Sequence, residues 1–192
     1  MLEAIIACGI ISTAVSSALT LVQLSISAEK ESENNIVAAN LAREGIEVVR
    51  AIRDSNWLAD DVWDKGLEGD SFDYTAVPVF SPQANSWSLD FTPNDIADAT
   101  AGVYRYTAGS DVAAIGLQVQ AAAQPEGTVA LPFSRLLTLD VICQNGEVRE
   151  VKESGTGCVG TKIGVRIRSR VHFKVSGRSR DIEAEESIYN WR

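Results

Sequence analysis

Hydrophobic positions divide the chain into an apolar N-terminal segment and a patterned remainder. From Leu2 to Ala28 nearly every residue is apolar or small, and the one charged side chain is Glu3. A helix that crosses a bilayer needs about 20 such residues. The serine and threonine hydroxyls in this segment can donate to the helix backbone, which makes them compatible with burial. The pattern predicts a membrane-spanning or core-buried helix over residues 1–28.

The helical pattern continues through residues 29–58 in an amphipathic form. One side of this segment is apolar, at alternating spacings of three and four residues: Ala38, Leu41, Gly45, Val48 and Ile52. This periodicity is typical of a helix that packs on a sheet. Because no proline separates the two halves, we expect one helix of about 55 residues, roughly 80 Å long.

A secretory signal peptide is the alternative interpretation of the apolar segment. Such a peptide carries a positive region before a short apolar core. Here no lysine or arginine precedes the apolar run, the run is longer than that core, and the helical pattern extends beyond it. We therefore expect the segment to stay in the mature protein.

Residues 59–192 carry strand patterns separated by turns. Apolar runs bounded by proline, glycine and polar residues occur at 72–80, 86–91, 102–107 and 134–143. Residues 94–131 have no clear pattern apart from the run at 102–107. The sequence predicts an α+β fold in which the long helix packs on the antiparallel β-sheet of a head formed by residues 59–192.

The clearest strand pattern lies near the C-terminus. Residues 163–175 alternate strictly between an apolar face and a basic face, and Ser176 and Gly177 can form a tight turn into a return strand. That turn places basic residues opposite acidic ones, in three pairs: Arg168 with Glu185, Arg170 with Glu183, and His172 with Asp181. Such pairs stabilise a hairpin by a few tenths of a kcal/mol each, roughly. Binding of a polyanion is the alternative role for the basic face.

Charge argues against nucleic acid as a partner. The formal net charge is −9, although residues 161–192 alone carry eight basic and four acidic side chains. Phosphate binding needs clustered, uncompensated lysine and arginine. We therefore expect no nucleic-acid partner.

The three cysteines fall into two groups. Cys8 lies in the apolar segment, whereas Cys143 and Cys158 flank a polar, glycine-containing stretch. Two cysteines that close a short loop in a protein with a membrane segment predict a disulfide formed in an oxidising compartment. Two free thiols are the alternative.

Catalytic and metal-binding signals are weak. The acidic stretch 59–70 lacks the spacing of an EF-hand, so we expect a solvated loop, with a calcium site as the alternative. His172 is the single histidine, and the sequence holds no nucleophile elbow, zinc-protease helix or phosphate-binding loop motif. We expect no enzyme activity, no catalytic residue, no cofactor and no metal.

Glu3 is the informative residue of the apolar segment. A carboxylate in such a helix is costly unless it is paired, for example with an α-amino group of another copy. The alternative is that Glu3 lies at the membrane surface and has no role.

The run LEAIIACGII, with a long helix that ends in LAREGIEVVRAIRDSNW, resembles the N-terminal half of type IV pilins, above all their pseudopilin-like members. The resemblance covers residues 1 to about 58. In the family the glutamate is fifth in the mature chain, whereas Glu3 is third here.

This resemblance implies a pilin-like lollipop that polymerises through its N-terminal helix, with Met1, Leu2 and Glu3 at the assembly end and a methylated first residue. It also implies, as partners, further copies or other pilins, the pilus assembly machinery and, before assembly, the membrane. The expected location is the bacterial inner membrane first and an extracellular surface filament afterwards. A pseudopilin of a type II secretion system and a membrane-anchored binding or enzymatic domain that never polymerises remain the alternatives.

Overall fold

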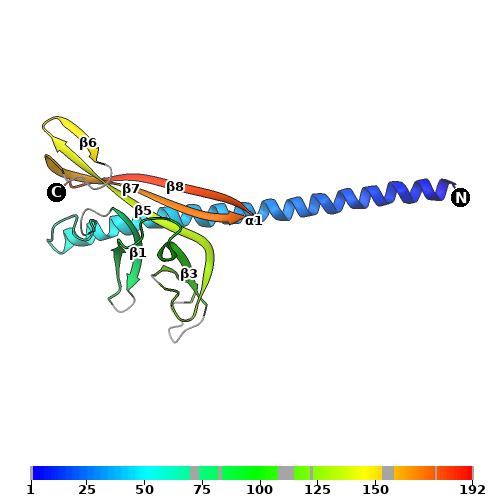
Figure 1. The fold of residues 1–192 in the computed structure, drawn as a ribbon, viewed down its shortest axis with the longest axis horizontal. Coiled ribbons are helices and arrows are strands. Elements are labelled where there is room, and N and C mark those ends of the chain that lie inside the picture. Colours follow the sequence, from blue (N-terminus) through cyan, green and yellow to red (C-terminus); the bar gives the residue numbers. More distant parts are fainter. Residues whose placement is uncertain are drawn as a thin grey trace.

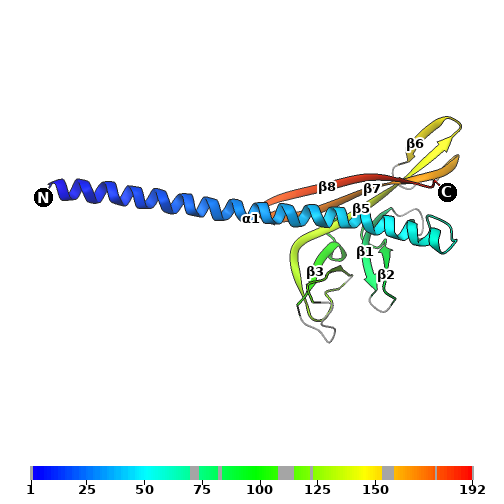
Figure 2. The same cartoon turned by 180° about the vertical axis from the view of Figure 1, so that it is seen from behind.

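A single α-helix runs the length of the molecule, and all strands lie beside its second half (Figures 1 and 2). The computed structural model describes residues 2–69, 74–81, 84–107, 115–121, 123–152, 158–175 and 177–191. Helix α1 spans Leu2–Leu58, 57 residues, without a break. The predicted continuous helix and the α+β fold class are therefore confirmed.

The strands form one antiparallel sheet. In chain order they are β1 (Thr75–Ser81), β2 (Ser86–Asp90), β3 (Gly102–Tyr106), β4 (Gln118–Gln120), β5 (Thr128–Asn145), β6 (Val148–Lys152), β7 (Thr161–Val175) and β8 (Arg178–Tyr189), with a short 3₁₀ helix η2 (Ala99–Ala101) before β3. Strand β5 is central: β7 pairs with residues 133–144 on one edge, while β3, β1 and β6 share the other edge. Strand β8 continues the sheet beyond β7.

Helix α1 packs on this sheet through the side that the sequence predicted. Ala38, Leu41, Gly45 and Val48 are buried, and Ile52 is half-buried. The buried face is wider than that stripe and also includes four further residues: Ala42, Ile46, Val49 and Arg53. Below them lie apolar side chains of β5 and β7, chiefly Phe133, Leu137, Leu139, Val165, Ile167, Val171 and Phe173.

Gly45 marks the closest approach of helix and sheet. A Cβ atom at this position would lie 2.6 Å from Ser169 Oγ and 2.7 Å from Leu137 Cδ2. Both distances are below van der Waals contact, so a residue with a side chain would force the helix or its neighbours to move. Glycine therefore sets the spacing between α1 and the sheet.

A buried arginine joins the helix to the central strand. Arg135 of β5 is 1% exposed and donates to Leu41 O at 3.0 Å and to Gln120 Oε1 at 2.6 Å. Burial lowers the pKa of Arg135, while Glu44 of α1, 3.5 Å away, favours its charged form. No local sequence pattern predicts this contact, because it joins residues 44, 120 and 135.

Two segments contain structure that the sequence did not indicate. The polar stretch between Cys143 and Cys158 contains β6, whose residues pair with the end of β5. The acidic segment after α1 is a mostly exposed loop, as expected, but its Trp63 and Leu67 are 8% and 1% exposed and belong to the core. Neither side chain is part of a periodic apolar pattern, so periodicity did not reveal it.

Candidate functional site

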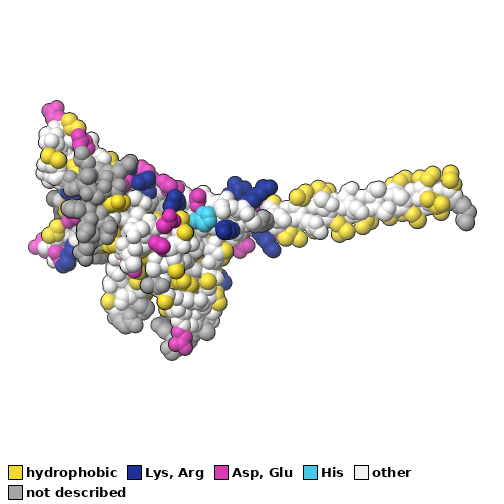
Figure 3. Space-filling view, viewed as in Figure 1, with side chains coloured by type: hydrophobic (Ala, Val, Ile, Leu, Met, Phe, Trp, Pro, Cys, Tyr) yellow, Lys and Arg dark blue, Asp and Glu magenta, His cyan; other side chains and the backbone are white. Residues whose placement is uncertain are grey.

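The first half of α1 is the most distinctive surface of the molecule. Every residue from Leu2 to Ala28, a segment that we call the stalk, is exposed. Eleven of these side chains are large and aliphatic: Leu2, Ile5, Ile6, Ile10, Ile11, Val15, Leu19, Leu21, Val22, Leu24 and Ile26. Figure 3 shows them along the whole stalk, outside the head. The helix is long and apolar enough to cross a membrane.

The hydroxyl groups at residues 12–20 of the stalk are satisfied within the helix. Ser12 Oγ donates to Gly9 O at 3.0 Å, Ser16 Oγ to Ser12 O at 2.8 Å, and Thr20 Oγ1 to Ser16 O at 3.0 Å. Ser17 makes the equivalent bond at 2.8 Å. These hydroxyls therefore need no water, as the sequence predicted, and the segment is compatible with an apolar environment.

The stalk has two different sides, a feature that sequence reasoning missed. Small or polar residues recur at spacings of four, three, four, three and four: Gly9, Thr13, Ser16, Thr20, Gln23 and Ser27. Ser27 and Ala38 are 11 residues apart, which is about three helical turns. The small, polar side therefore continues the side that packs on the sheet, and most large aliphatic side chains lie elsewhere. A search for periodicity among small residues would have found it.

The assembly residues expected from the resemblance lie at the free end of the stalk. Leu2 is 76% exposed and Glu3 is also exposed. Among the described residues, none lies within salt-bridge distance of Glu3. Met1 lies outside the described residues.

The β7–β8 hairpin has the register that the sequence predicted. Arg168 is opposite Glu185, Arg170 opposite Glu183, and His172 opposite Asp181. Val175 pairs with Arg178, and Gly177 has a φ of +78°, which suits a tight turn. Ser176 lies outside the described residues.

The partners within that register differ from one pair to the next. His172 Nδ1 lies 2.7 Å from Asp181 Oδ1, so this pair forms a contact. Arg168 is opposite Glu185 as predicted, and its guanidinium also lies 3.2 Å from Asp140 Oδ2 on β5. Arg166 approaches the same oxygen at 2.8 Å. Asp140 is 1% exposed, and a buried carboxylate needs such cations.

In the third pair, both Arg170 and Glu183 are exposed. In the part of the chain that the structure describes, the two residues are opposite in register but form no salt bridge with each other. Acidic residues of β5 and β8 thus pair with much of the basic face. This weakens the alternative that the basic face binds a polyanion.

The predicted disulfide is confirmed. Cys143 of β5 is bonded to Cys158, and their Cα atoms are 5.5 Å apart. The bond ties the segment after β6 to the central strand. Cys8 is free and exposed on the stalk.

A lysine of β7 forms salt bridges with acidic side chains of the segment after α1. Lys162 Nζ of β7 lies 2.8 Å from Asp64 Oδ2, forms a salt bridge with Glu68, and lies 5.5 Å from the centre of the Trp63 ring. Lys65 pairs with Asp61. Within the described residues, which exclude Asp70, no group of three potential ligands could hold a metal ion. The calcium alternative gains no support from this arrangement.

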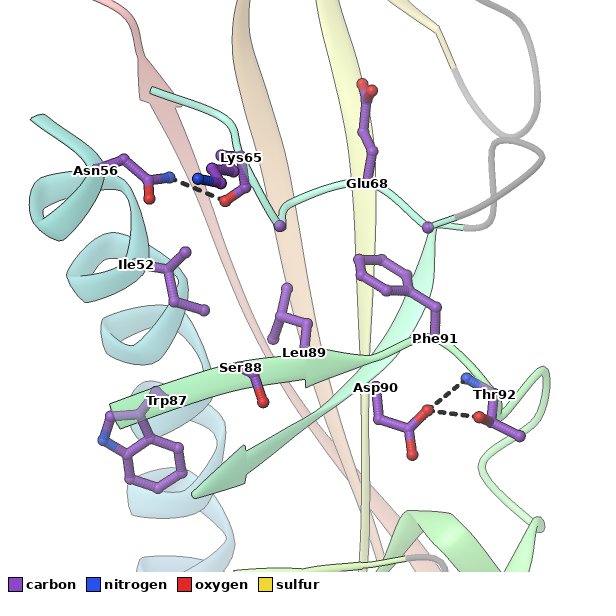
Figure 4. Close-up of a pocket in the computed structure, with 12 residues that line it drawn as sticks. Ile52, Asn56, Lys65, Glu68, Trp87, Ser88, Leu89, Asp90, Phe91 and Thr92 are labelled. Atoms are coloured by element: carbon purple, nitrogen blue, oxygen red, sulfur yellow. Dashed lines mark hydrogen bonds between the residues drawn. The ribbon is translucent and has the colours of Figure 1, made fainter. Parts of the chain in front are cut away.

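An open groove of about 720 Å³ lies between the end of α1, the segment after it and β2. Ile52, Leu89 and Phe91 line it on the inside, while Glu68 points away and Asp90 accepts hydrogen bonds from Thr92 (Figure 4). The three apolar side chains also pack against the core of the head. We therefore interpret the groove as incomplete core packing, and the stalk remains the candidate site.

Comparisons with protein-family models, with curated proteins and with solved structures find no match to this chain.

Proposed function

We propose that this chain is a structural subunit of a type IV pilus-like filament that assembles through its stalk. The observation that carries the proposal is the exposure of eleven large aliphatic side chains, each by about half or more, on a helix continuous with a folded head. Burial of each such side chain is worth roughly 1.5–3 kcal/mol. A stalk left in water is therefore strongly unfavourable, and it requires lipid or protein around it.

The membrane is the first of these environments. A helix of this length and composition can cross a bilayer, with the head on one side. The disulfide of the head indicates an oxidising compartment, which in a bacterium lies outside the inner membrane. We infer that before assembly the stalk spans the inner membrane and the head lies in that oxidising compartment.

Other copies of the stalk provide the second environment. Small residues allow helix backbones to approach closely, and the stalk presents them along one side. Because the head is broader than the helix that carries it (Figure 1), level heads would hold the stalks apart, and we expect copies that bundle by their stalks to be staggered along the axis. Staggered contacts of this kind do not close into a ring and produce an open helical fibre.

Glu3 would set the register of that fibre. A carboxylate buried among apolar stalks must find a cation, for example an α-amino group of a neighbouring copy. The proposed role is structural, with no catalytic step and no cofactor.

Assembly of variants tests the proposal. In purified full-length protein from which detergent is removed, we expect filaments in electron micrographs. Ile11→Asn and Glu3→Ala should abolish or strongly reduce them, while thermal unfolding of the head is unchanged. The control is Val129→Asn, which changes a 40% exposed valine of the head and should leave assembly intact.

Two results would contradict the proposal. Glu3→Ala and Ile11→Asn chains that assemble like the wild type would exclude the stalk as the assembly element. A wild-type chain that stays monomeric in bilayers, with no fibre in cells, would instead favour a membrane-anchored domain, whereas a secretion defect without surface fibres would favour a secretion pseudopilin.

A further inference from the structure

The end of the head farthest from the stalk exposes apolar and acidic side chains together. Here α1 ends, and the C-terminus lies beside it (Figure 1). Leu58, Val62 and Trp191 are 89%, 64% and 74% exposed, and Asp60 and Asp61 lie between the first two. Asp61 also pairs with Lys65 of the same loop. The Trp191 ring is held 4.8 Å from that of Trp57. We call Leu58, Asp60, Asp61, Val62 and Trp191 the tip.

The opposite end of the head, where the stalk enters it, is basic on the side of the β7–β8 turn. Lys174 and Arg178 are exposed there, and Arg180 pairs with Glu31 and so holds the turn against the helix. Figure 3 shows lysine and arginine side chains gathered at this junction. We call Lys174, Arg178 and Arg180 the base.

Acidic side chains near the base lie elsewhere or are paired. Asp181 contacts His172. Glu29 and Glu33 are each two positions from Glu31, which faces the turn, so they lie about 200° around the helix axis from it. Cations therefore dominate the surface that the turn presents along the axis.

The lengths of the two helix halves allow the tip and the base to meet in a filament. The stalk, residues 2–28, is about 40 Å long, and residues 29–58 are about 45 Å long. If the stalk of one copy runs beside residues 29–58 of the copy below, the base of the first copy stands at the tip of the second. In a bundle of several stalks, neighbours at smaller staggers keep stalk against stalk, while copies one stalk length apart bring these opposite charges together.

We propose that in the filament the tip of each head docks against the base of the next copy, with Asp60 and Asp61 facing Lys174 and Arg178. This inference rests on the proposed function and adds a second interface to it. The apolar tip side chains lose contact with water in that interface, which accounts for exposure that a monomer would not need. The occupant is a second copy of this chain.

A charge exchange within one chain tests the contact. Asp60→Lys with Asp61→Lys reverses the tip, and Lys174→Asp with Arg178→Asp reverses the base. Either change alone should lower filament yield about tenfold or more, because like charges then face each other. The chain with all four changes restores complementarity between copies and should recover most of the yield. Arg105→Asp, an exposed reversal on β3, is the matched control and should assemble normally.

The outcomes separate this contact from the proposed function. Wild-type yield from either reversed chain would overturn the contact and leave assembly by the stalk standing. Defective single reversals whose combination is equally defective, with heads that unfold at the wild-type temperature, would also overturn it. A wild-type chain that forms no filament would overturn the proposed function and this contact with it.

Discussion

The two halves of α1 have the same secondary structure and opposite relations to the rest of the molecule. Residues 29–58 bury one side on the sheet, with Gly45 at the closest contact and Arg135 bonded to the helix backbone. Residues 2–28 extend away from the head and are exposed throughout (Figure 1). The comparison teaches that helix formation and burial are separate requirements: the first half forms a helix whose burial must come from outside the chain.

Removal of residues 1–28 should give the largest effect. We expect complete loss of filaments and of membrane association, with almost no change in the unfolding temperature of the head, because the stalk is exposed throughout and buries no part of the core. Electron microscopy and calorimetry on the truncated chain measure both. A head that fails to fold without the stalk would show that the two halves are not independent.

Loss of the disulfide should destabilise the head alone. The bond joins residues 15 positions apart, and a loop of that length corresponds to about 3 kcal/mol of stability. We expect Cys158→Ser to lower the denaturant midpoint accordingly, and Cys8→Ser on the stalk to leave it unchanged. A large loss from Cys8→Ser would contradict the independence of the stalk.

Substitution of two glycines by alanine tests the contrast between the packed half of α1 and the exposed stalk, because each change adds one methyl group. Gly45→Ala places a Cβ 2.6 Å from Ser169 Oγ, so we expect about 1–3 kcal/mol of destabilisation. Gly9→Ala meets nothing within 4 Å, and should leave the denaturant midpoint of the head unchanged. Equal losses from the two changes would contradict the close packing at Gly45.

The smallest expected effect concerns Asp61 at the end of α1. The hydrogen bond from Lys65, with that from the Val62 backbone, lowers the pKa of Asp61 below its ordinary value. A lowered pKa in the folded state gives stability that is present above the unfolded pKa and is lost as the pH falls through the folded pKa. Lys65→Met should raise the pKa of Asp61 in an NMR titration. An unchanged titration curve would show that the pair does not form in solution.

Sequence periodicity predicted the parts of the fold that repeat along the chain. The 57-residue helix, its sheet-facing stripe and the β7–β8 register follow from spacings of three or four residues and of two. The disulfide followed from the distance between two cysteines and the membrane segment before them.

The parts that periodicity missed depend on contacts between distant segments. Asp140 forms a salt bridge with Arg168 because β5 lies beside β7. No local pattern indicates which acidic residue an arginine of β7 contacts. The three-residue strand β4 and the buried Arg135 depend in the same way on tertiary neighbours. For the stalk the sequence predicted the helix and its apolar character, while its small, polar side was missed because only the large apolar residues were tested for periodicity.

The central claim is that copies of the stalk surround one another, and Cys8 permits the most direct measurement. It is the one free cysteine of the three, and it is exposed on the stalk. A nitroxide attached to Cys8 should show dipolar coupling between copies once detergent is removed, together with loss of access to water-soluble relaxation agents. Labels that stay magnetically isolated in every preparation, including lipid bilayers, would contradict the claim.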